Sequence, residues 1–155
     1  MSSKTTHTII GLAVGYGLAK WGNTSGWQEA ALYLGAYMGS SAPDWMELPS
    51  SKRTAHLFSS DTHERVSVIP HRTLTHTTLF WVLATAYSAY FLINYGPIWQ
   101  ALVFFAFCVS GLAHLLCDLT TPMGCPLLPF GKRYRLTFKG LKQAHVIQKH
   151  TGWFV

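Results

Sequence analysis

The chain has 155 residues, of which 49% are hydrophobic and only 12% are charged, and its formal net charge is +6. The length fits a single domain, and the charged fraction, about half the usual share, argues against an ordinary soluble protein. Long stretches carry no charge at all, which is typical of a membrane protein with several spans. Three cysteines, two of them inside an apolar run, do not indicate a disulfide framework.

Four apolar stretches are predicted to form membrane-spanning helices. They cover residues 5–20, 27–42, 74–95 and 98–119. Small residues recur at helical spacing in the first two stretches, and Gly11 and Gly15 form a small-xxx-small pair that suits close packing. These small-residue faces would also permit a homo-oligomer.

The remaining segments carry most of the charge. With four spans, the N-terminus, the polar connection over residues 43–72 and the C-terminal tail lie on one side of the membrane. That side holds eleven of the twelve basic residues, and Lys20 alone lies on the other side. The positive-inside rule therefore makes both termini cytoplasmic.

The expected architecture is all-α and polytopic, with two parts. Residues 1–130 form a helical membrane domain, and residues 131–155 form a short basic cytoplasmic tail. Alternating polar and apolar residues near Tyr134–Phe138 favour a hairpin or a surface strand within that tail.

The most informative motif is His114-Leu-Leu-Cys-Asp118, near the end of the fourth apolar stretch. Residues four apart share one face of a helix, and Pro122 and Gly124 mark the helix end just beyond Asp118. An imidazole and a carboxylate at this spacing can bind one divalent metal ion. The alternative is a simple His–Asp hydrogen bond at a helix end.

Further histidines and aspartates fall at the ends of the other predicted helices, on the same cytoplasmic side. These are His7, Asp44, His71 and His76. Such nitrogen and oxygen ligands on converging helices suit one or two zinc-like ions. Taken singly, His7 could instead be an interfacial residue and Asp44 a turn residue. His71 and His76 can meet only if His71 precedes the helix, with Thr73 or Thr75 as its cap.

Several of these motifs together resemble the YdjM family of small bacterial inner-membrane proteins, described as metal-dependent hydrolases. The matching elements are Pro43-Asp44, His71-Arg-Thr-Leu-Thr-His76 and His114-x-x-x-Asp118 followed by Thr121-Pro-Met-Gly124. The resemblance implies metal ligands at His7, Asp44, His71, His76, His114 and Asp118. It also implies a multi-pass protein of the bacterial inner membrane and a distant kinship to zinc-dependent phospholipases C and single-strand nucleases.

The chain departs from the family pattern after the second helix. Where the family usually reads Pro-Asp-x-Asp-His, this sequence has Met46 and Glu47 in place of the last two residues. Either Glu47 substitutes as a carboxylate ligand, or one metal position is lost.

The leading hypothesis is a membrane-embedded hydrolase with a divalent metal, zinc by preference, at the cytoplasmic face. Asp44, Glu47 or Asp118 would act as general base, and Arg72 would hold an anionic group of a phosphoester or lipid substrate. Two alternatives remain open. The metal site, or a His–Asp network alone, could be structural, or the basic tail could dock on anionic lipid or a partner. Nucleic acid is the less favoured partner.

Overall fold

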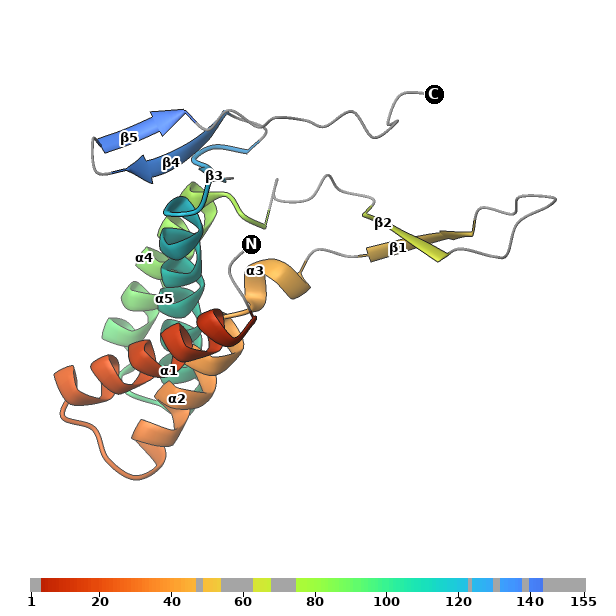
Figure 1. Cartoon of the computed structure of the whole chain (residues 1–155). Coiled ribbons are helices and arrows are strands. Elements are labelled where there is room, and N and C mark those ends of the chain that lie inside the picture. The colour runs from red at the N-terminus through yellow and green to blue at the C-terminus, as the bar shows by residue number, and fades with distance from the viewer. Residues whose placement is uncertain are drawn as a thin grey trace.

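A computed structural model describes residues 4–46, 49–53, 63–67, 75–122, 124–129, 132–137 and 140–143. These residues form a bundle of helices with a small sheet across one of its ends (Figure 1). The helices are α1 (Lys4–Trp21), α2 (Trp27–Gly39), α3 (Ala42–Trp45), α4 (Thr78–Tyr95) and α5 (Trp99–Leu119). The four predicted helices therefore correspond to α1, α2, α4 and α5.

Two predicted helix boundaries were wrong. The second helix ends at Gly39, and a separate short helix, α3, carries Pro43 and Asp44. Pro43 lies in the first turn of α3, where its missing N–H costs nothing. The next helix, α4, begins at Thr78 with Thr77 as its N-cap, so neither Thr73 nor Thr75 is the cap.

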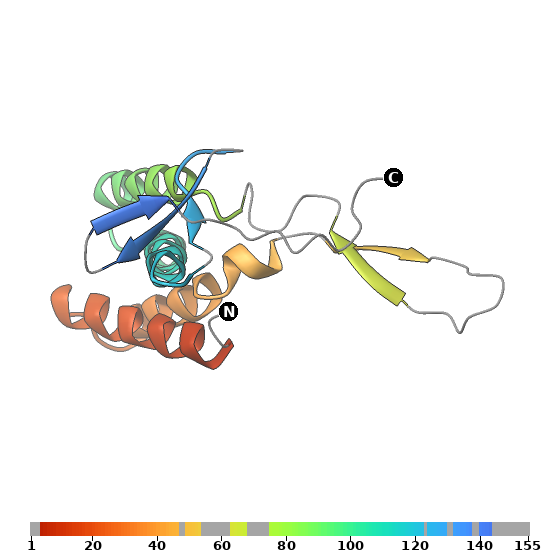
Figure 2. The same cartoon turned by 45° about the horizontal axis from the view of Figure 1, so that its top comes forward.

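Helix α5 lies at the centre of the bundle and packs against α1, α2 and α4 (Figure 2). Its contact with α2 depends on glycine, because a Cβ atom on Gly35 or Gly39 would collide with the carbonyl oxygens of Val103 and Phe107. Backbones that approach this closely need small residues at the crossing. The small-residue pattern predicted from sequence is thus the contact surface between α2 and α5.

Buried side chains form two clusters along α5. One joins α1, α2 and α5 and consists mainly of alanines: Ala19, Ala31, Leu32, Ala36, Leu102 and Ala106. The other lies near the last turns of α5 and comprises Ala42, Trp81, Leu115, Leu119 and Cys125. Trp81 is its largest member, and the ring lies directly against Gly111, where a Cβ would clash.

Two small antiparallel sheets complete the described structure. One pairs β1 (Pro49–Arg53) with β2 (His63–Ser67), within the connection that was expected to be merely polar. The other has the order β3 (Cys125–Pro126), β4 (Arg133–Thr137) and β5 (Gly140–Gln143). The hairpin of β4 and β5 confirms the strand expected near Tyr134. The division at residue 130 stays a prediction, and β3 and β4 pair across it.

The expectation of four full spans is not confirmed. Among the described residues only α5 is both long and apolar enough to cross a bilayer, with a mean hydropathy of 2.0 over its best window. Helix α2 has 13 residues, well short of the roughly 20 that a span needs. Large apolar side chains nevertheless lie exposed on α1, α2, α4 and α5.

Candidate metal centre

Five of the six predicted metal ligands converge at one end of the bundle. His7 comes from the start of α1, Asp44 from α3, His76 from the turn before α4, and His114 and Asp118 from α5. His71, together with Arg72 and Glu47, lies outside the described residues. The structure therefore joins side chains separated by more than a hundred positions of sequence into one cluster.

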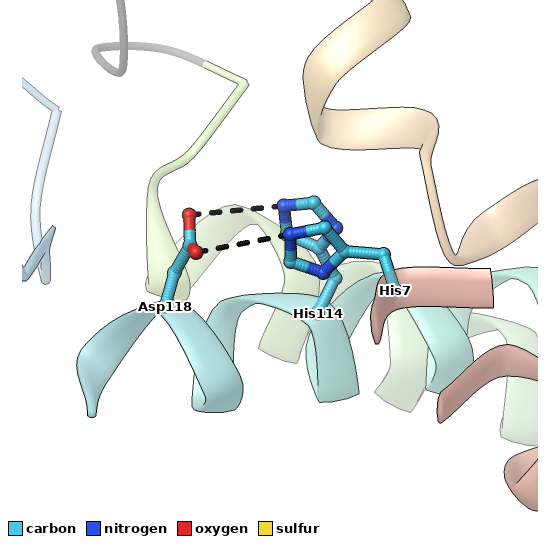
Figure 3. A group of neighbouring side chains, drawn as sticks. All are labelled: His7, His114 and Asp118. Carbon is cyan, nitrogen blue, oxygen red and sulfur yellow. Dashed lines mark ion pairs between the residues drawn. The ribbon is translucent and has the colours of Figure 1, made fainter. Parts of the chain in front are cut away.

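His114 and Asp118 form the base of the cluster (Figure 3). As the four-residue spacing predicted, they share one face of α5, with His114 Nε2 3.8 Å from Asp118 Oδ2. The His7 ring stacks on the His114 ring at a centroid distance of 3.8 Å, and His7 Nε2 lies 4.0 Å from Asp118 Oδ1. The two carboxylate oxygens of Asp118 thus face two different histidines.

Asp44 and His76 approach from the other side of His114. His76 Nε2 lies 3.3 Å from Asp44 Oδ1 and 4.0 Å from Asp118 Oδ2, while His114 Nε2 lies 3.8 Å from Asp44 Oδ1. Two triads result, and in each the ligand atoms lie within 4.8 Å of one another: His7 with His114 and Asp118, and Asp44 with His76 and His114.

Burial differs sharply across the cluster. His76, His114 and Asp118 are completely buried and His7 is 5% exposed, whereas the Asp44 side chain is 45% exposed. Asp44 consequently forms the open side of the site. Burial by itself would raise the pKa of the Asp44 carboxyl, but the hydrogen bond with His76 and the charges of the nearby histidines outweigh it and lower that pKa. Asp44 is therefore a carboxylate near neutral pH.

The orientation of His114 is fixed by the end of α2. Its Nδ1 donates a hydrogen bond of 2.6 Å to the carbonyl oxygen of Ser40, the C-cap residue of that helix. A carbonyl at a helix end has no partner within its own helix, so His114 satisfies it. The bond leaves Nε2 as the nitrogen that faces the site, and Nε2 has no hydrogen-bond partner among the described residues.

A second support holds the segment that carries His76. The Trp81 indole donates a hydrogen bond of 2.7 Å to the Thr75 carbonyl, and Thr75 Oγ1 lies 3.3 Å from His76 Nδ1. The start of α4 is also tied to β3, because Leu79 N–H donates to Leu127 O and Thr78 Oγ1 donates to Pro126 O. Sequence reasoning missed the Ser40 carbonyl and Trp81, since neither carries a ligand motif.

The chemistry of this donor set fits a divalent metal ion. Neutral imidazole nitrogens and carboxylate oxygens are the ligands that zinc takes in proteins, and ligand histidines usually donate their second N–H to a carbonyl, as His114 does. Because Nδ1 of His114 is used in this way, only Nε2 remains for a metal. Both triads contain His114, so they cannot each hold a separate ion through His114 at the same time.

The fold and the cluster together define a mainly helical protein with a long apolar central helix and a buried His–Asp cluster. The chain belongs to the YdjM inner membrane protein family, whose model matches residues 1–153. The resemblance seen in the motifs is thereby confirmed. No curated protein and no solved structure gives a significant match.

Proposed function

We propose that the chain is a metal-dependent hydrolase of the inner membrane, with zinc held by His76, His114 and Asp118. This set takes one residue from each triad beside His114, because Asp118 Oδ2 lies 4.0 Å from His76 Nε2 and 3.8 Å from His114 Nε2. The observation that carries this proposal is the convergence of buried ligands from separate elements around His114 Nε2, a buried nitrogen without a hydrogen-bond partner in the described structure. A buried polar atom of this kind is costly unless it meets a ligand. His7 Nε2 lies 4.0 Å from Asp118 Oδ1, and the His7 ring stacks on His114, so His7 would supply a further nitrogen ligand.

Each protein group has a distinct part in such a site. When bound, a zinc ion would supply Lewis acidity and lower the pKa of a water molecule. Asp44 is the half-exposed carboxylate of the cluster, and in this proposal it would meet the substrate and either take a proton as general base or orient the attacking water. Asp118 is buried and suits a ligand better than a base. Glu47 and Arg72 keep their expected roles as a substitute carboxylate and an anion-binding group.

The substrate class that we propose is a phosphoester, with phospholipids as the first candidates. Among the described residues, Arg133, Arg135 and Lys142 lie in the sheet at the site's end of the bundle, and the surrounding helices expose apolar side chains. A substrate with an anionic head and an apolar tail would meet both surfaces.

We further propose that the site faces the cytoplasm and that the chain passes the membrane several times. Exposed aromatic residues mark the opposite helix ends: Trp21, Trp27, Tyr95 and Trp99. Tryptophan and tyrosine favour the membrane–water boundary. Lys20 alone is basic at that end, so the positive-inside rule supports a cytoplasmic site.

A structural metal site is the second candidate. Its support is the closed character of the cluster, in which four of the five side chains are at most 6% exposed. Structural zinc sites are closed, whereas catalytic sites keep an open position. The site joins α1, α3, α5 and the start of α4, so an ion there would hold the bundle together.

The deciding experiment compares metal content and activity. Zinc per chain is measured by elemental mass spectrometry in detergent-purified wild type, His114→Ala, His76→Ala and Asp44→Asn, with Glu29→Gln in the first turn of α2 as the control carboxylate. Hydrolysis of bis(p-nitrophenyl) phosphate and of phospholipid is assayed alongside. We expect both histidine variants to lose zinc. A hydrolase predicts that Asp44→Asn stays folded but inactive. Absence of zinc from a folded wild type would exclude both proposals.

A further inference from the structure

The sheet at the end of the bundle has two chemically different faces. In an antiparallel sheet directly paired residues share a face, and alternate residues along a strand do so as well. The pairs Tyr134–Gln143 and Leu136–Leu141 therefore lie on one face, and the pair Arg135–Lys142 lies on the other. The sheet is amphipathic.

The apolar face is turned toward the helices. Cys125 of β3 pairs with Tyr134 and so lies on the same face, and its Sγ donates to the carbonyl of Leu115 on α5. Leu136 and Leu141 continue this face beyond the contact with α5, and both are about half exposed, at 52% and 51%. Two adjacent leucines thus project from the sheet on the side where the helices lie, with no described part of the chain covering them.

The opposite face is cationic. Arg133, Arg135 and Lys142 alternate along it, and the chain contains no acidic residue after Asp118. Arg135 Nε is buried and has no hydrogen-bond partner among the described residues. Arg135 and Lys142 are paired across β4 and β5, so they place two adjacent cationic side chains on this face, where an anion would be attracted.

A hollow lies beside the apolar face. It has a volume of about 350 Å³ and is lined by Leu127, Leu128, Lys132 and Tyr134. Leu127 accepts a hydrogen bond from Leu79 at the start of α4, a helix without charged residues. The hollow thus combines an ammonium group with leucine walls next to an exposed apolar helix.

We infer that the β3–β4–β5 sheet is an interfacial element that binds anionic phospholipid of the surrounding bilayer. Its leucines face the acyl region beside α4 and α5, and its arginines and lysines face the phosphates. The chain belongs to an inner membrane protein family, so this lipid is at hand. Paired apolar and cationic surfaces of this kind match the boundary between acyl chains and headgroups. The lipid-binding surface is separate from the metal ligands. Its role is therefore additional to the proposed hydrolysis.

Lipid selectivity provides the first test. The full-length protein is equilibrated with equimolar phosphatidylglycerol and phosphatidylcholine, and bound lipids are counted by native mass spectrometry. Three variants are compared with the wild type. Lys142→Gln lies on the sheet, and Lys20→Gln at the far end of α1 is its matched control. A double variant combines Lys142→Gln with Arg135→Gln. Since each cation near an anionic surface contributes about fivefold, the double variant, which lacks two cations, should retain about 25-fold less phosphatidylglycerol. Zinc content should not change. Equal retention by Lys142→Gln and Lys20→Gln would overturn the inference.

Depth in the bilayer provides the second test. Spin labels are attached at Leu141→Cys and Lys142→Cys in a Cys117→Ser background, because the other two cysteines are buried. In phosphatidylglycerol nanodiscs the spin label at 141 should be accessible to oxygen and inaccessible to a soluble nickel chelate. The label at 142 should show the reverse accessibilities. Equal access to nickel would overturn the inference. Spin–spin coupling at 141 would also overturn it, because a second copy of the chain would then cover the leucines.

Discussion

Ser40 and His114 lie 74 positions apart in sequence, yet the Ser40 carbonyl accepts a 2.6 Å hydrogen bond from the His114 ring. The end of α2 therefore sets the orientation of a side chain on α5. This bond distinguishes His114 from His7, whose Nδ1 has no hydrogen-bond partner among the described residues.

His114→Ala should destabilise the metal-free protein more than His7→Ala does. His114→Ala leaves the buried Ser40 carbonyl without its donor, which costs about 1–3 kcal/mol. His7→Ala removes the stacked ring and the long 4.0 Å contact of Nε2 with Asp118 Oδ1, but no hydrogen bond of Nδ1, which has no partner in the described structure. Thermal unfolding of chelator-treated variants measures the difference. Equal losses would show that the Ser40 contact contributes nothing to stability.

Chelation should lower the unfolding temperature of the wild type. An ion that binds only the folded state stabilises it by about 2.7 kcal/mol when its free concentration is 100 times its Kd. The ligands come from α1, α3, α5 and the segment before α4, so all of these would loosen together. The measurement is a thermal scan with and without chelator. His76→Ala serves as control and should show little or no chelator effect.

Trp81→Phe should weaken metal binding although Trp81 is no ligand. The substitution removes the hydrogen bond to the Thr75 carbonyl, next to His76. Loss of a group that orients a ligand typically costs about 10–100-fold in affinity. Competition with a fluorescent zinc chelator measures the change. Trp99→Phe, at the start of α5, is the matched control and should retain the wild-type affinity.

Gly35→Ala and Gly39→Ala should separate α2 from α5. A single methyl group at either position meets the carbonyl oxygen of Val103 or Phe107, which belong to a helix backbone and cannot turn away. Both variants should aggregate or unfold at lower temperature on size exclusion and thermal scans. Gly17→Ala, whose added Cβ meets nothing within 4 Å, should behave as wild type or slightly better. A fully stable Gly35→Ala protein would contradict the packing described here.

Sequence reasoning located the helices and the His–Asp cluster at their ends because both depend on local patterns. The His114–Asp118 spacing placed two groups on one face of a helix, and helix ends at Pro43 and Pro122 placed the remaining ligands at one end of the bundle. If successive helices form hairpins, their directions alternate along the chain. The start of the first helix, with His7, and the end of the second, with Asp44, then lie at the same end of the bundle as His114 and Asp118.

Other features had no local signal. Thr77 rather than Thr75 caps α4, because β3 binds the first turn of that helix and fixes where it begins. The stacking of His7 on His114 follows from the glycine-mediated approach of the helices, which depends on three elements at once. Hydropathy counted four spans because it does not distinguish a short helix such as α2 from a full crossing.

The short length of α2 has a consequence for the surrounding lipid. At 1.5 Å per residue its 13 residues extend about 20 Å, whereas the 21 residues of α5 extend about 32 Å. In the proposed multi-pass arrangement, a bilayer core of about 30 Å would match α5 but exceed α2, so hydrophobic mismatch would arise where α2 meets lipid. A bilayer that adjusts to α2 would thin there and bring its headgroups down toward Ser40. The lipids beside α2 would then have their phosphates at the depth of His114.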